Sequence, residues 1–443
     1  MLQALRRRVS GHRHLLTGSA AMVVTVAVQA LSGSLFWLIA ARLDTQTDVG
    51  HATALYTSAL FVAFLAGLGL PVAVARYAAG RTRDDHVLYA WSALATIVAA
   101  ALGAAAYVAC VRPDAVDELA GWHGAVGPAL FMVLSAGTAL SLLLDVRLMT
   151  QRRWGLVLAR NVAVGVARFP LLAIDPVDSR AVWLLVIAAL PTALSGFGGL
   201  ALLPRVTGAR HQLAPMPERV RPMVRYSLVN WASTLAYQMP TFAMPVIVLM
   251  HVDADANASF YVAWGAASLA CYIPNAIGQA LLAEGGRDGA RLRSQVRLAL
   301  LVAGGLMVGC AVVAAVGREL IVTLYGDDYR EAADIVPLLV AAAIPWAVTS
   351  VYLTEARVRH RHAATVAITL ALSAAILIPA LVVVPDHGLA GASWAFLGGN
   401  AAAAVVALGA HISGRATSDD DVVVHTSPDV LEPEDVANMA PLA

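Results

Sequence analysis

The most unusual chemistry in this sequence is a pair of arginines inside an apolar run. The segment "RNVAVGVARFPLLAID" carries Arg160 and Arg168 between stretches of Val, Ala, Leu and Phe. A guanidinium presents a rigid fork of N–H donors that binds a phosphate or a carboxylate bidentately. Asn161, Gly165 and Arg168 stand at i, i+4 and i+7, which places them on one face of a helix. The pattern predicts a polar face on which Arg168 attracts an anionic group of a substrate.

Each of the two arginines also has a simpler interpretation. Arg168 lies about 9 Å from the outer end of its segment, and its long side chain can reach outward to Asp175 or Asp178. Arg160 lies about 9 Å from the inner end, at a depth that Asp145 should share across a short turn. An ion pair between Asp145 and Arg160 is the plain interpretation, and an inward-facing ion site built on both is the alternative.

Other apolar runs carry polar residues at helical spacing. Polar side chains are costly in lipid, so these stripes should face protein or a water-filled cavity. Two stripes are short: Thr25, Gln29 and Ser32, and Thr138, Ser141 and Asp145. Two are longer and contain prolines: Asn230, Thr234, Tyr237, Gln238 and Thr241, and Ser268, Tyr272, Asn275 and Gln279. They predict either the walls of one central cavity or ordinary hydrogen bonding between helices.

Four further charged residues lie near the expected inner ends of apolar runs or at membrane depth. Arg76 and Arg225 are candidates for binding an anionic substrate, although they also fit the ordinary excess of arginine on the inner side. Asp145 and Glu355 are the acids closest to membrane depth. Each is a candidate for ion coupling or for neutralising a nearby arginine, such as Arg147 or Arg357.

Composition places all of these residues in a membrane protein. Of 443 residues, 59% are hydrophobic and 13% are charged, whereas charged residues make up about 25% of soluble proteins. A helix that crosses the hydrocarbon core needs about 20 apolar residues. That criterion predicts twelve membrane-spanning helices, at 17–41, 50–75, 87–110, 124–148, 154–174, 181–203, 224–250, 258–283, 296–317, 333–354, 363–384 and 388–411.

The arginines predict the orientation, because cytoplasmic loops carry an excess of them. With the N-terminus inside, 23 of the 30 basic residues fall on the inner side and five on the outer side. The remaining two are Arg160 and Arg168. Both chain ends are therefore expected in the cytoplasm.

The longest inner loop divides the predicted helices into two lobes. We expect an all-α polytopic membrane protein with two lobes of six helices each, which would be parallel repeats because six is even. The expected parts are a basic cytoplasmic N-terminus at 1–16, an N-terminal lobe at 17–204, a linker at 205–222, a C-terminal lobe at 223–411 and a disordered acidic cytoplasmic tail at 412–443.

Several classes of function find no support. Cys110, Cys271 and Cys310 lie in apolar runs without CxxC or His partners, so we expect neither a disulfide nor a metal, and no cofactor. No nucleophile motif is present, the arginines are too dispersed for nucleic-acid binding, and we predict no enzyme. A membrane-embedded glycan polymerase is disfavoured because no outer loop exceeds about fifteen residues.

Three segments together resemble a known superfamily. They are "AARLDTQTDVGHATALYTSALFVAFLAGLGLPVAVARYAAG", "ELIVTLYGDDYREAADIVPLLVAAAIPWAVTSVYLTEARVRHRHAATVAI" and "VVPDHGLAGASWAFLGG". With twelve predicted helices, they resemble the multidrug/oligosaccharidyl-lipid/polysaccharide (MOP) exporters, and most of all the Wzx-type polysaccharide flippases. The resemblance covers about residues 15 to 411.

The resemblance implies a flippase of the cytoplasmic membrane that works by alternating access. Its substrate would be a polyprenyl-diphosphate-linked oligosaccharide, a cell-envelope or exopolysaccharide precursor, and its partners a glycan polymerase and other envelope-assembly proteins. A cation-coupled multidrug exporter of the same superfamily, similar to the MATE transporters, is the alternative. That branch usually has an acid within its first span, and none is found here, because Asp44 lies at the outer end.

Overall fold

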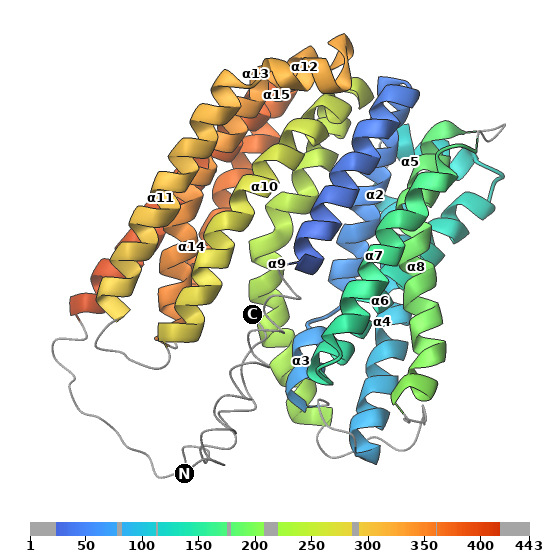
Figure 1. Ribbon diagram of the computed structural model, residues 1–443, viewed down its shortest axis with the longest axis horizontal. Helices are drawn as coiled ribbons and strands as arrows, with labels where there is room; N and C mark the ends of the chain where they lie inside the picture. The colour runs from blue at the N-terminus through green and yellow to red at the C-terminus, as the bar shows by residue number, and fades with distance from the viewer. Residues whose placement is uncertain are drawn as a thin grey trace. The chain divides into compact units, whose positions relative to one another are not determined.

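The structure is a computed structural model, which describes residues 24–77, 82–111, 114–174, 179–207, 220–285, 292–359 and 361–416. Over these ranges all regular secondary structure is helical (Figure 1). Nine helices in the described ranges are long and apolar enough to cross a membrane. The chain is therefore a polytopic membrane protein, helical throughout the described ranges.

The chain forms two compact units, Met1–Asn230 and Trp231–Ala443, whose boundary lies inside α9. The first unit contains a first helix, Val24–Leu43, followed by α2 (Gln46–Ala66), α3 (Leu70–Tyr77), α4 (Arg83–Cys110), α5 (Asp114–Gly121), α6 (Val126–Thr150), α7 (Trp154–Leu171), α8 (Arg180–Thr207) and the start of α9 (Val220–His251). The linker expected at 205–222 falls mainly outside the described residues. The predicted limits of the lobes therefore stay a prediction.

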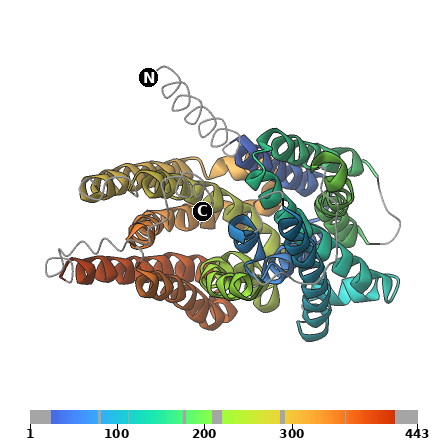
Figure 2. The same cartoon turned by 90° about the horizontal axis from the view of Figure 1, so that it is seen from below.

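The second unit contains the rest of α9 and the helices that follow it. These are α10 (Ala254–Gly285), α11 (Leu292–Val316), α12 (Glu319–Tyr325), a short 3-10 turn (Asp327–Tyr329), α13 (Arg330–Ala341), α14 (Ala343–Val358) and α15 (His362–Ala416). Within this unit α11 and α15 both pack against α14 (Figure 2). Gly388 has φ 53° and ψ −136°, so α15 is two helices joined at a kink. These correspond to the predicted helices at 363–384 and 388–411.

Several details differ from the predicted helices. The segment expected as one helix at 50–75 begins at Gln46 and is interrupted after Ala66, because Leu68 and Gly69 have φ of 47° and 68°. A left-handed residue cannot continue a right-handed helix. The segments between the predicted helices after α4 and after α11 contain the short helices α5 and α12.

Small residues let two central helices of the first unit approach closely. In α6 and α8, a Cβ added at Gly196 would lie 2.2 Å from the carbonyl oxygen of Gly137, and one added at Gly137 would lie 2.5 Å from the Cβ of Ala193. Contact through small residues is the usual way for helices to pack in a membrane, where lipid provides no hydrophobic drive between them. Because the two helices are so close, Ser141 of α6 and Ser195 of α8 can both reach Arg160 of α7.

Polar contacts join the helix ends on the side of the first unit that the arginines assign to the outside. Arg180 at the start of α8 pairs with Asp44 after the first helix and donates to the carbonyl of Ile174 beyond α7, at 2.9 Å. On α5, Glu118 contacts His51 Nδ1 at 2.8 Å and accepts from Ser179 Oγ at 2.6 Å.

We expect Gly196→Ala to destabilise the first unit. The new methyl group would collide with backbone atoms of α6, and overpacking of this kind costs about 1–3 kcal/mol. The melting temperature of the purified full-length protein should fall by several degrees. Gly198→Ala is the control on the same helix, since a Cβ there meets nothing within 4 Å. Equal melting of the two variants would contradict the close packing.

We also expect the contact at Glu118 to depend on pH. The hydrogen bond with His51, with help from Ser179, holds the pKa of Glu118 below its ordinary value, against partial burial, which raises it. Its folded pKa is thus below the unfolded one. The stabilisation is complete above the unfolded pKa, about 4.3, and is lost as the pH falls through the folded pKa.

Glu118→Gln should therefore lower the melting temperature at pH 7 and have no effect at pH 3. Glu118 is partly exposed, so the difference should be no more than about 1 kcal/mol. Asp117→Asn, at an exposed position of the same helix, is the control. If Glu118→Gln lowered the melting temperature equally at both pH values, the hydrogen bond with His51 would not be the cause of the lowered pKa of Glu118.

Candidate functional site

Helix α7 turns a polar face toward the protein. Its four buried residues are Val157, Asn161, Gly165 and Arg168, at spacings that place them on one face. The opposite side carries exposed Val162 and Val166. The helix thus has its apolar side outward and its polar side inward, as a helix in lipid requires.

The polar stripe of the first helix lies against this face. Gln29 Nε2 donates to Asn161 Oδ1 at 2.6 Å, although the two residues are 132 positions apart. One step further along, a Cβ at Gly165 would come within 2.8 Å of Ser32 Oγ, so the two helices touch there. The two stripes that the sequence predicted for the first and fifth spans therefore bond to each other. Whether they also line a cavity stays a prediction.

Arg160 is bound in a polar cluster formed by three helices. Its guanidinium pairs with Asp145 of α6, and the same group donates to Ser141 Oγ at 2.5 Å and to Ser195 Oγ at 3.1 Å. The Asp145 and Arg160 side chains are 15% and 13% exposed. One carboxylate oxygen, Asp145 Oδ1, is buried without a hydrogen bond. The pair is close to neutral as a unit, so it offers little net charge to a substrate.

Arg168 is the contrasting case. It is 9% exposed and donates to Thr192 Oγ1 of α8 at 3.3 Å, while its Nε is buried without a hydrogen bond. No acid of the described ranges forms an ion pair with it, and Asp175 and Asp178 lie outside those ranges. With Thr192 as its hydrogen-bond partner among the described residues, the guanidinium keeps most of its capacity to bind an anion, because two of its N–H donors can engage one phosphate.

In the second unit, polar residues of three helices meet around one amide. Tyr237 of α9 donates to Asn275 Oδ1 of α10 at 3.1 Å, and Ser350 of α14 reaches the same oxygen at 3.4 Å. The ring of Trp346 lies 5.3 Å from that of Tyr237, and its indole N–H is buried without a partner. This cluster is uncharged, with aromatic and amide character.

The remaining predicted residues are more scattered. Gln238 is half-buried, whereas the side chains of Asn230 and Gln279 lie outside the described residues. Arg76 and Arg225 are exposed, and the Arg76 guanidinium lies 4.7 Å from the ring centre of Tyr226. A cation over an aromatic face is a stable arrangement by itself.

Glu355 is 4% exposed, and its partners are residues that the sequence did not suggest. Arg359 and His411 contact its two carboxylate oxygens, in place of Arg357. Thr192 and Ser195, which bind the two arginines of α7, were also missed. Their signal in the sequence is a pair of hydroxyls three positions apart in an apolar run, "LPTALSGFGG".

No group of three or more His, Cys, Asp or Glu side chains within the described ranges is arranged to hold a metal ion. The first unit's polar residues present guanidinium, amide, hydroxyl and carboxylate groups, and the second unit's cluster presents amide, hydroxyl and aromatic groups. Such groups bind and orient a ligand through hydrogen bonds and charge.

Comparison with known proteins identifies the fold. The chain is similar to an inward-facing multidrug resistance MATE family transporter of the MOP superfamily, with a TM-score of 0.70, 14% identity and coverage of 90% of this chain and 99% of that chain. It is similar to the lipid II flippase MurJ in an inward closed conformation, with a TM-score of 0.69, 11% identity and coverage of 90% and 87%. No family model and no curated protein sequence matches the chain.

These similarities show that the chain has the fold shared by MATE transporters and MurJ. At 14% and 11% identity the likeness is one of fold.

We expect the pair of Asp145 and Arg160 to be strongly coupled. Asp145→Asn or Arg160→Gln alone leaves a buried charge unpaired, which costs about 3–5 kcal/mol. The double variant should lose much less than the sum, in a cycle measured by denaturation of the full-length protein. Arg330 and Glu319, whose side chains are 52% and 59% exposed, provide a control pair. Additive effects at Asp145 and Arg160 would contradict the coupling.

Proposed function

We propose that this protein is a flippase of the cytoplasmic membrane. Its substrate is a polyprenyl-diphosphate-linked oligosaccharide, a precursor of a cell-envelope glycan or exopolysaccharide, moved from the inner to the outer leaflet by alternating access. Twelve helices cross the membrane in this proposal, and both chain ends face the cytoplasm. Nine helices of the described ranges are candidates by length and composition. Adding α7 and α10, and counting α15 as two helices joined at its kink, gives twelve.

The observation that carries the proposal is Arg168. A buried guanidinium is expensive within a membrane and is ordinarily kept for a function. Its chemistry suits a diphosphate, since each phosphate offers oxygens to two parallel N–H donors. The cluster of Tyr237, Asn275 and Trp346 in the second unit is of the type that hydrogen-bonds and packs against sugars, and we assign it to the glycan.

A cation-coupled exporter of small molecules is the second candidate. An inward-facing MATE transporter matches the fold with a TM-score of 0.70, against 0.69 for MurJ. Against it stands the first helix, where Gln29 occupies the centre of the polar stripe and no acid occurs between Val24 and Leu43. An exported cation would also meet the repulsive charge of Arg168. A glycan polymerase has the least support.

We expect Arg168→Ala to lower flipping by about 10- to 100-fold, since a hydrogen bond to a charged group contributes about 1.5–3 kcal/mol. Arg168→Lys should restore part of the activity, because an ammonium keeps the charge and loses the fork. The measurement is complementation of a depleted strain, with mass spectrometry of polyprenyl-linked lipids and a test of which leaflet holds them.

Arg221→Ala, at an exposed position of α9, is the control for charge and abundance. Accumulation of lipid-linked oligosaccharide in the inner leaflet with Arg168→Ala, and none with Arg221→Ala, is the expected result. Full activity of Arg168→Ala at normal abundance would refute the role of Arg168. No accumulation in the depleted strain itself would favour the small-molecule exporter.

A further inference from the structure

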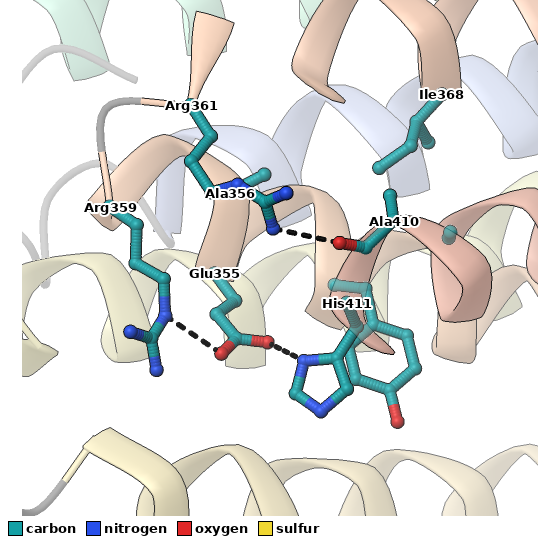
Figure 3. A pocket seen from close by; sticks show the side chains of 9 residues that line it. Glu355, Ala356, Arg359, Arg361, Ile368, Ala410 and His411 are labelled. Atoms are coloured by element: carbon teal, nitrogen blue, oxygen red, sulfur yellow. Dashed lines mark hydrogen bonds and ion pairs between the residues drawn. The ribbon is translucent and has the colours of Figure 1, made fainter. Parts of the chain in front are cut away.

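A small hollow lies in the second unit, where α14 ends and the last turns of α15 pass it (Figure 3). It has room for about one water molecule. Its polar lining consists of Tyr352, Glu355, Arg359, Arg361 and His411, and its apolar lining of Ala356, Ile368, Ala407 and Ala410. The arginine distribution assigns this end of the unit to the cytoplasm.

Both oxygens of the Glu355 carboxylate are engaged. Arg359 Nε donates to Oε1 at 3.0 Å, four residues further along the chain, and His411 Nδ1 lies 2.5 Å from Oε2 across the two helices (Figure 3). The Glu355 and His411 side chains are only 6% and 9% exposed. The contact between these buried groups is a polar link between α14 and the end of α15.

Two other contacts hold His411 in place. Its ring stacks on that of Tyr352 with a centroid distance of 4.5 Å. Next to it, the carbonyl of Ala410 accepts a hydrogen bond from Arg361 Nη1 at 2.7 Å, which ties the loop between α14 and α15 to the same turn (Figure 3). The stacking orients the imidazole, and the bond at Ala410 holds the backbone next to it.

The charged and titratable groups around the pair come from three elements. Helix α14 and its following loop bring Tyr352, Glu355, Arg359 and Arg361. Arg357 of the same helix interacts electrostatically with Tyr237. The packed helix α9 brings Tyr237. Within the described ranges Glu355 is the carboxylate that meets His411, so the state of this one bond depends on the charge of the imidazole.

Histidine is the side chain whose charge ordinarily changes near physiological pH. A neutral imidazole with its proton on Nδ1 gives the carboxylate an ordinary hydrogen bond. An imidazolium gives it a charge-assisted bond, which is roughly twice as strong. The hollow offers a place for the water molecule that would deliver the proton.

We propose that Glu355 and His411 form a proton-binding site, which fastens the end of α15 to α14 more tightly when His411 is protonated. The site reports the pH of the cytoplasmic side and sets how freely the inner ends of these helices move. Its regulatory meaning rests on the proposed transport function, whereas proton binding itself does not.

The test compares the melting temperature of the purified full-length protein with that of His411→Gln between pH 8 and pH 5.5. Glutamine can still donate to Glu355 but cannot gain a proton. The advantage of the unchanged protein should grow by about 2 to 4 °C as the pH falls. His362→Gln, at an exposed histidine of the same helix, is the control and should follow the unchanged protein at every pH.

Glu355→Gln is the second variant, in case His411→Gln does not fold. It keeps an acceptor and removes the charge, so it should also flatten the pH dependence. A constant difference across the pH range in the variants that fold would overturn the proposal, as would an equal effect of His362→Gln. The melting experiment needs no substrate, so a failure of the flipping assay would count against the transport function alone.

Discussion

A positive charge can lie within a membrane only where the protein supplies its partners, and this requirement organises the first unit. Arg160 and Arg168 would be prohibitively costly against lipid. Both turn inward on α7, where Asp145, Ser141 and Ser195 receive one and Thr192 receives the other. The rotation of α7, with Val162 and Val166 outward, follows from this requirement.

Close packing makes these contacts possible. Hydroxyls are short side chains, so Ser141 and Ser195 reach the same guanidinium only because Gly137 and Gly196 allow α6 and α8 to touch. Gly165 plays the same part where Ser32 of the first helix meets α7. Glycines and small polar residues thus act together, the first setting the distance and the second using it.

The two units place different chemistry at their polar sites. Arg168 gives the first unit a buried positive group, whereas Tyr237, Asn275 and Trp346 give the second an uncharged cluster of aromatic and amide character. Charge recognition and recognition by amide and aromatic groups are different kinds of binding chemistry. The fold alone carries no such preference, because MATE transporters and MurJ share it.

The sequence by itself determined the class of the protein and the polar face of α7, because hydropathy and helical periodicity are local properties of one segment. The predicted segments overlap the nine apolar helices of the described ranges, but the interruption at Leu68 and Gly69 and the short helices α5 and α12 were not foreseen. Only the tertiary structure decided the partners, such as Gln29 with Asn161 and Glu355 with His411. Such pairs join residues 132 and 56 positions apart. Their meeting depends on how each helix is rotated and how closely its neighbours pack, which no single segment encodes.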